Sequence, residues 1–516
     1  MRRRDRLPAE ALLSAALAAL LIGCAQPALD LAPPRPDRPW QPSTNGQGEI
    51  VPGKPAPVSA SSYVLPANPS LGAVPAPPTL DSSRRYTLPE LVDIAQSSHP
   101  ETRIAWNDAR NAALAAGIAQ SAYLPRVTAS VVGGHTSAHG QSTALGDTRD
   151  TSATGTGTIS ALSLQWLLFD FGQREATVEA AQQVSVASNI AFTAAHQRII
   201  HAVCVAFYAL TAAQAQVETA EQSLRNALEV EAAAAERYKR GIGTVIEVNQ
   251  ARQASAQARL GQVRAKGGAQ DAYLALVSAM GISPLAKFEV ADVSHRALSG
   301  SMLQPVQRIV SDALARRPDV LAAYAAQKAS AASVRAAEAD FRPKVFMSAT
   351  GSYNSGHLGV SAIPAIPSTS QQQAPTFNVA NSRWGSNVIV GVTVPLYDGR
   401  VRDSVLMQAQ ANADKAAAAL DRVREEAVRQ IVAAQNTLET SLAAHDASIA
   451  LAQAAQTSFD AAFDAYRHGV GPITAVSVAQ TQLLQAQAAS NEAHSAALAA
   501  AATLAFATGA LGAAPP

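Results

Sequence analysis

Tyr238-Lys239-Arg240-Gly241 and Tyr466-Arg467-His468-Gly469 are two copies of one short sequence, 228 residues apart. Leu168-Phe169-Asp170 and Leu396-Tyr397-Asp398 recur with the same spacing. Two further pairs recur with a spacing of 218, namely His99-Pro100-Glu101 with Arg317-Pro318-Asp319, and Tyr123-Leu124-Pro125-Arg126-Val127 with Phe341-Arg342-Pro343-Lys344-Val345. Four pairs in two registers indicate an internal duplication.

The two copies differ in length by ten net residues, and the difference falls between Val127 and Leu168. Insertions collect in exposed loops, so this interval is expected to contain one. We predict a first structural repeat over residues 86–298 and a second over residues 299–516. Each repeat reads as helix, strand, loop, strand, long helix, turn and helix.

Prolines mark both ends of the first helix in each repeat. Pro100 and Pro318 stand at the first helical position, and an acidic residue follows each of them, as helix N-termini favour. Pro125 and Pro343 cannot continue a helix, so these helices are expected to end just before them.

Apolar and polar residues alternate with a period of two in three segments. Their apolar faces are Leu162, Leu164, Trp166 and Leu168; Val345, Met347, Ala349 and Tyr353; and Val388, Val390, Val392, Val394 and Leu396. The segments have about the length of tilted strands that cross a bilayer, so we predict membrane-crossing hairpins. A soluble hairpin with one wet face would show the same alternation.

The segments Gly133–Gly157 and Gly356–Ser386 connect the predicted strands and are rich in Gly, Ser, Thr and His. They lack helical periodicity, so both are expected to be loops. Of these, His135–Gly155 and Gly356–Trp384 are expected to face the cell exterior.

Gly172–Arg240 and Gly399–His468 contain no proline and almost no glycine, which predicts two helices of roughly 100 Å each. Apolar residues recur every seven positions and predict coiled-coil seams. The first seam is Val203, Leu210, Val217 and Leu224, and the second is Leu442, Ile449 and Phe463, interrupted by Gln456. After the turns, Thr244–Met280 and Ile473–Leu511 are expected to return as helices.

The N-terminus has the pattern of a targeting signal. Four arginines precede a short apolar stretch that ends in Leu21-Ile22-Gly23-Cys24, which resembles a bacterial lipobox. We therefore predict a lipoprotein signal peptide over residues 1–23 and a lipid on Cys24, whereas an incidental cysteine after an ordinary signal peptide is the alternative. Residues 24–85 are proline-rich and predict a tether.

The composition excludes several classes of function. Lys plus Arg number 40 and Asp plus Glu 39, so no basic surface for nucleic acid is indicated. His196 and His201 are five residues apart, and His135, His139 and His357 lack metal-ligand spacing. We find no catalytic constellation and expect no enzyme, no metal site and no cofactor.

The predicted elements cannot form a closed structure within one chain. Four strands do not close a barrel, and open strand edges are not tolerated in lipid. Several chains must therefore pool their strands. The predicted fold class is an α+β membrane protein, a β-barrel continuous with a long α-helical coiled-coil barrel.

The repeated sequences resemble the TolC/NodT-type outer-membrane factor family over about residues 84–512. The most specific parts are the two glycine turns and the corners Phe169-Asp170-Phe171-Gly172 and Leu396-Tyr397-Asp398-Gly399. The resemblance implies a homotrimer with twelve strands in the outer-membrane lipid and twelve helices in the periplasm. It also implies a periplasmic adaptor and an inner-membrane pump as partners.

The resemblance further implies that the two turns form the periplasmic tip and aperture. The candidate site residues are Tyr238, Arg240, Gly241, Gly243, Glu247, Tyr466, Arg467, His468, Gly469 and Gly471. Arg467 and Glu247 are candidate closing contacts. Family members often carry Asp after the second turn, but Ile473-Thr474-Ala475-Val476-Ser477-Val478 contains none, which puts an acidic ring in doubt.

The expected function is to pass small molecules, such as drugs or toxic compounds, out of the cell. Type I protein secretion is the alternative within the same class. A structural coiled-coil lipoprotein is the alternative from another class, although a spacer needs no paired strands of membrane length.

Overall fold

The computed structural model describes residues 83–144, 147–293, 306–356 and 383–512, together with Leu298 and short stretches between residues 32 and 81. The chain separates into two units, residues 1–78 and 79–516. The described elements of the first unit are β1 (Ser43–Thr44), β2 (Ile50–Val51) and the 3-10 helix η2 (Pro69–Leu71). Cys24 and its predicted lipid lie outside the described residues.

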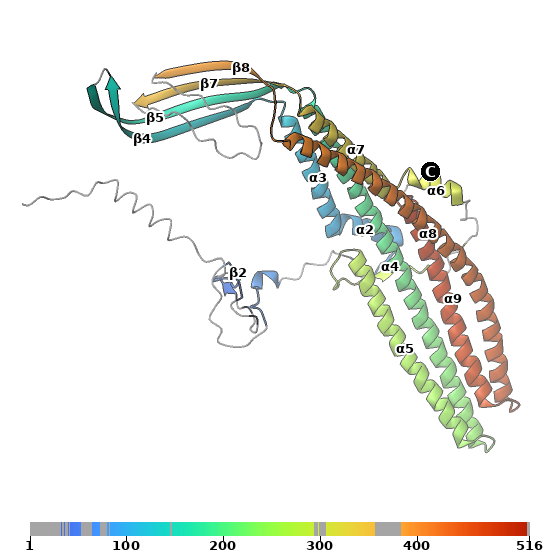
Figure 1. Cartoon of the computed structure of the whole chain (residues 1–516). Coiled ribbons are helices and arrows are strands. Elements are labelled where there is room, and N and C mark those ends of the chain that lie inside the picture. The colour runs from blue at the N-terminus through green and yellow to red at the C-terminus, as the bar shows by residue number, and fades with distance from the viewer. Residues whose placement is uncertain are drawn as a thin grey trace, which may run out of the picture. The chain divides into compact units, whose positions relative to one another are not determined.

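Two long helical hairpins dominate the second unit (Figure 1). Helix α4 (Gln173–Lys239) turns into α5 (Val245–Ala279), and α8 (Val401–Arg467) turns into α9 (Ile473–Ala507). The long helices contain 67 residues each and the returning helices 35 each. The two long helices and the two returning helices predicted from the sequence are therefore confirmed.

Shorter helices flank the hairpins. Helix α3 (Pro100–Ser121) packs along α4, and α7 (Pro318–Ala339) packs along both α4 and α8. Both begin with proline at the first position, as the sequence predicts. The sequence patterns did not reveal α2 (Leu88–Ser98) and α6 (Val306–Leu314), because each is only two to three turns long. Strands β3 (Arg85–Tyr86) and β6 (Glu289–Val290) pair in parallel.

A four-stranded antiparallel sheet adjoins the helices (Figure 1). Its strands are β4 (Arg126–Ala144), β5 (Asp147–Phe169), β7 (Lys344–Gly356) and β8 (Trp384–Thr393), in the order β4-β5-β7-β8. Strands from both predicted repeats therefore share one sheet.

The predicted alternation is confirmed for the residues that lie in the sheet, whereas Val394 and Leu396 follow the end of β8. Leu164 pairs with Val127 on one side and Ala349 on the other, and Ala349 pairs with Val388. These residues share one face, because paired residues in a ladder point the same way. On β8 this apolar face is open, with Val388 71% exposed. The opposite face is mixed and carries Ser163, Gln165, Thr350 and Asn387 together with Leu167, Phe346 and Ile389.

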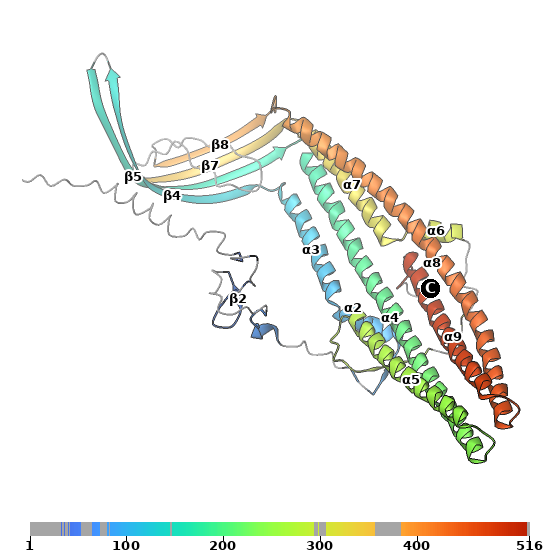
Figure 2. The ribbon, with the colours of Figure 1, turned by 60° about the horizontal axis from the view of Figure 1, so that its bottom comes forward.

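The prediction of a loop over Gly133–Gly157 is wrong. Strands β4 and β5 remain paired out to Ala144 and Asp147, whereas the pairing of β5 with β7 ends at Gly157 opposite Gly356. The two-stranded ribbon therefore extends past the rest of the sheet (Figure 2). A ribbon held by backbone hydrogen bonds needs no apolar face, so alternation fails to reveal it. Most of the other predicted loop lies outside the described residues.

The predicted seam of α8 is also misplaced. Ile449 is 39% exposed, whereas Ile431, Leu438, Phe459 and Tyr466 are buried and fall on a different heptad. This heptad lies 228 residues after Val203 and Leu210 of α4, which are buried as predicted. The repeat spacing therefore identifies the buried heptad, which the hydrophobic pattern of α8 alone does not, because His445 and Ala452 interrupt it between Leu438 and Phe459.

Two large clusters of buried side chains stabilise the hairpins. One surrounds Phe207 and Leu276 and includes Leu498 of α9. The other lies toward the turns and includes Val230, Phe459 and Tyr466. The alanine-rich end of α9 belongs to this packing, because Leu498 and Ala507 are both buried.

Candidate functional site

The first glycine turn joins α4 to α5. Gly241 has φ +74°, a left-handed conformation that side chains with a Cβ disfavour. The Ile242 N–H donates to the Arg237 carbonyl at 3.0 Å and so closes the end of α4. Thr244 begins α5, where its Oγ1 accepts from the Glu247 N–H at 3.2 Å.

The second glycine turn joins α8 to α9 in the same way. Gly469 has φ +81°, and the Val470 N–H donates to the Ala465 carbonyl at 2.9 Å. A Cβ on Gly471 would lie 3.1 Å from the Ala465 Cβ, and one on Gly243 would lie 3.0 Å from the Tyr238 nitrogen. Both turns therefore need their second glycine for close packing rather than for a left-handed φ.

Arg237 connects the two turns, although the sequence patterns did not single it out. Its Nη1 donates to the Tyr466 carbonyl at 2.8 Å, and its Nη2 donates to the Ile242 carbonyl at 3.3 Å. The guanidinium lies over the Tyr466 ring, 4.8 Å from its centre. One cation thus stabilises the C-terminal ends of both α4 and α8.

Tyr466 is enclosed between the two hairpins and is 1% exposed. Its hydroxyl donates to Glu247 Oε2 at 3.3 Å. Burial raises the pKa of the Tyr466 hydroxyl, and the negative charge of Glu247 raises it further. Arg237, Tyr466 and Glu247 therefore form one contact set, which we call the tip clasp.

The other predicted site residues lie around the tip clasp without joining it. Tyr238 is 51% exposed, and Arg240 pairs with Glu236 at 2.9 Å within α4. The guanidinium of Arg467 lies over Phe463 of its own helix, 5.8 Å from the ring centre. Glu247 thus contacts Tyr466 within the chain, whereas the contact that we observe for Arg467 is with Phe463 of its own helix. A closing role for Arg467 stays a prediction.

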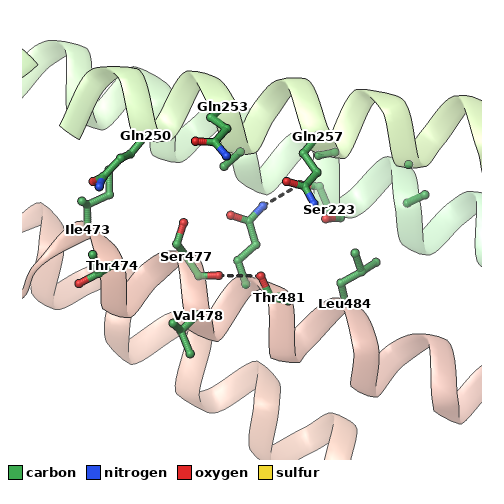
Figure 3. A pocket seen from close by; sticks show the side chains of 15 residues that line it. Ser223, Gln250, Gln253, Gln257, Ile473, Thr474, Ser477, Val478, Thr481 and Leu484 are labelled. Carbon is green, nitrogen blue, oxygen red and sulfur yellow. Dashed lines mark hydrogen bonds between the residues drawn. The ribbon is translucent and has the colours of Figure 1, made fainter. Parts of the chain in front are cut away.

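A groove runs between α5 and α9 just above the turns (Figure 3). Its volume is about 400 Å³, and its floor includes Ala220 and Ser223 of α4. The Gln480 side chain spans the floor and donates to the Ser223 carbonyl at 3.1 Å. All 15 side chains drawn around it are uncharged. Its polar lining consists of Ser223, Gln250, Gln253, Gln257, Thr474, Ser477, Gln480 and Thr481.

Several proteins resemble this chain. CyaE of Bordetella pertussis is 28% identical over 415 residues, which cover 80% of this chain and 82% of CyaE. The outer membrane protein OprJ of Pseudomonas aeruginosa is 27% identical over 301 residues, 58% of this chain and 59% of OprJ. The crystal structure of the outer membrane protein VceC of Vibrio cholerae has a TM-score of 0.69 at 21% identity, covering 82% of this chain and 96% of VceC.

The sequence model of one family matches the chain in two blocks, residues 91–282 and 309–510. Each block contains a complete hairpin and two strands of the sheet. The resemblance stated from the glycine turns is thereby confirmed, and so is the location in the outer membrane. The chain belongs to the outer membrane efflux protein family.

Proposed function

We propose that three copies of this chain form a channel that passes small molecules from an inner-membrane pump and a periplasmic adaptor to the exterior. Each copy contributes four strands to a barrel and two hairpins to a tunnel. The observation that carries the proposal is an open sheet with one apolar face, built next to two hairpins of equal length.

The edges of the sheet support the assembly. Across the described residues, β4 pairs with β5 alone and β8 with β7 alone, so each edge strand has one unpaired side. In hydrocarbon, each unpaired backbone N–H or C=O group costs roughly several kcal/mol, because it has lost its hydrogen bonds to water. Pairing β8 of one copy with β4 of the next satisfies both edges.

Disulfide cross-linking of the edges tests the assembly. Cys204 of α4 is a buried free cysteine and is first replaced by alanine. In this background, Val127→Cys on β4 is combined in turn with Val388→Cys, Val390→Cys or Val392→Cys on β8. One combination should give covalent trimers on non-reducing gels. Leu162→Cys on the central strand β5 is the matched control and should give none. If every edge pair stays monomeric, the proposed barrel is wrong.

We also propose roles for the tip clasp and the groove at the periplasmic end. We place the aperture at the two turns and the adaptor against the groove beside them. Its amide and hydroxyl groups offer hydrogen bonds without charge, which suits a helix that presents its own amides or hydroxyls. Replacing Ser477 with Trp should fill the groove and abolish pull-down of the adaptor, whereas Ser458→Trp on an exposed face of α8 should not.

Deletion of the gene tests which class of molecule the proposed channel exports. Cells that lack the chain should become susceptible to toxic small molecules, and the intact gene should restore resistance. Unchanged susceptibility together with loss of a secreted protein would favour type I secretion instead.

We also propose that residues 1–23 are removed, that Cys24 carries lipid and that residues 24–85 tether it to the repeats at 86–298 and 299–516. Mass spectrometry of the mature N-terminal peptide should find acylated Cys24. An unmodified start elsewhere contradicts the lipid anchor. Because the strands also hold the protein in the membrane, Cys24→Ser should retain part of the export.

A further inference from the structure

His445 of α8 and His494 of α9 face each other across the second hairpin. Their ring centres are 5.2 Å apart, and the ring planes form an angle of 56°. Both side chains are half-buried, so solvent reaches the pair. The two residues are 49 positions apart in the chain, and only the fold brings them together.

His445 occupies a seam position of the coiled coil. It lies seven residues after Leu438 and fourteen before Phe459, both of which are buried. A histidine at such a position is unusual, because seams favour apolar residues. The equivalent residue of α4, 228 positions earlier, is Val217. The duplicated scaffold therefore does not require an imidazole here.

At the equivalent position the first hairpin has an ion pair instead of two histidines. Lys266 of α5 is the equivalent of His494, and its Nζ lies 3.0 Å from Glu221 Oε1 of α4. The residue equivalent to Glu221 is Ile449, which offers no charge. The ion pair that joins α4 to α5 is thus replaced by two facing imidazoles between α8 and α9.

The spacing of the imidazoles matches two ligands of one metal ion. An imidazole nitrogen binds Zn²⁺ at about 2.0–2.1 Å and lies about 1.1 Å from its own ring centre. Two rings on one tetrahedral ion, at an angle of about 109°, therefore have centres about 5.2 Å apart. The observed separation is 5.2 Å.

The state of His445 suits a metal ligand. Its Nδ1 is buried and has no hydrogen-bond partner among the described residues. An imidazole nitrogen that no protein group occupies can coordinate a metal ion.

We propose that His445 and His494 together bind one divalent transition-metal ion, of the class that imidazole prefers, such as Zn²⁺. In the described part of the chain no third histidine, cysteine or carboxylate joins the pair, so water completes the coordination. The ion cross-links α8 to α9 about 33 Å above the second turn, since 22 residues separate His445 from Arg467.

Isothermal titration of Zn²⁺ into the purified full-length protein in detergent tests the site. The expected result is one ion per chain. His445→Gln and His494→Gln should each weaken binding roughly tenfold or more, because each removes half of the protein ligands. His196→Gln is the matched control, since His196 meets the Phe192 ring of its own helix edge to face, and this variant should bind as the wild type does.

A second measurement avoids any effect of the substitutions on folding. Electron paramagnetic resonance of the wild-type protein with one equivalent of Cu²⁺ should show two coordinated imidazole nitrogens. Absence of Zn²⁺ binding to the wild type, equal binding by the His445→Gln variant, or a Cu²⁺ spectrum with one nitrogen would each overturn the proposal.

Discussion

Tyr238 and Tyr466 occupy equivalent positions at the ends of two helices of equal length, yet the first is 51% exposed and the second 1%. The difference lies in what surrounds them. Tyr466 contacts Arg237 and Glu247 of the first hairpin. The residues equivalent to Arg237 and Glu247 in the second hairpin are Ala465 and Ala475.

The two hairpins therefore share a scaffold but have different tips. The first hairpin supplies the charges and the second supplies the aromatic ring that the charges hold. A neighbouring copy that presents its second hairpin to Tyr238 offers alanines at the same two positions. The clasp therefore forms within one chain, and in the proposed trimer we expect the contacts between chains at the tips to differ from it.

The strongest test of this comparison replaces the two left-handed glycines. Gly469→Val should abolish export while trimers still assemble. The left-handed backbone costs about 1–3 kcal/mol with a branched side chain, and the added Cβ would lie 3.2 Å from Arg237 Nη1. Gly241→Val has the same strain but no atom within 4 Å, so it should retain part of the export. Drug susceptibility and trimer content measure both. Equal losses in the two variants would contradict a special role for the clasp.

A second contrast lies where the strands meet the long helices. Arg174 pairs with Asp170 at 2.9 Å and also donates to the carbonyls of Ala122, Leu167 and Leu168. Arg402 pairs with Asp398 at 2.6 Å and makes no further side-chain hydrogen bond that we observe in the described structure.

Arg174→Ala should therefore destabilise the protein more than Arg402→Ala does. It leaves Asp170, which is 5% exposed, without its cation, at a cost of about 3 kcal/mol. The cost of Arg402→Ala should be roughly 1–2 kcal/mol, because Asp398 is more exposed. Thermal unfolding of the two purified variants measures which one is less stable. If Arg402→Ala were the less stable variant, the difference inferred between the two strand-to-helix corners would be wrong.

Arg237→Ala removes the central contact of the tip clasp. It deletes the bond to the Tyr466 carbonyl and the cation–π contact, together about 1.5–2 kcal/mol, and should favour an open aperture roughly tenfold. Conductance in planar bilayers should rise. Arg240→Ala is the control, since Arg240 is exposed and pairs only within α4, and its conductance should match the wild type.

Tyr466→Phe should have the smallest effect. It deletes the bond to Glu247 and costs about 0.5–1.5 kcal/mol, whereas Tyr238→Phe should cost nothing. Because the folded-state pKa of Tyr466 is raised, its contribution is complete below the ordinary value of 10.0 and is lost as pH rises through the folded-state value. Wild-type conductance should therefore increase at alkaline pH. A similar increase in Tyr466→Phe would assign the effect to another group.

Much of the fold could be predicted from the sequence, because local signals mark it. Pro100 and Pro318 start helices, the glycine turns end them, and valines alternate along β8. The β4–β5 ribbon and the α8 seam were missed because neither has an unbroken apolar period. Backbone pairing stabilises the ribbon, and His445 and Ala452 interrupt the seam between Leu438 and Phe459.

The site was less accessible to sequence reasoning. The turns, Tyr466 and Glu247 carry local or repeated patterns, but Arg237 acts on a residue 229 positions away. One signal was available, because Arg237 and Glu247 are charged where the other repeat has alanine. Departures from an internal repeat mark positions where the two copies have taken different roles.

The equal lengths of the hairpins also constrain how such a gene can change. A seven-residue insertion in α4 and α5 alone would carry the first turn about 10 Å beyond the second and separate Arg237 from Tyr466. Selection would therefore retain a change in length only when both halves of the gene acquire it. Among related proteins, both hairpins should therefore differ in length by the same number of whole heptads, and the depth that the protein reaches in the periplasm should differ accordingly.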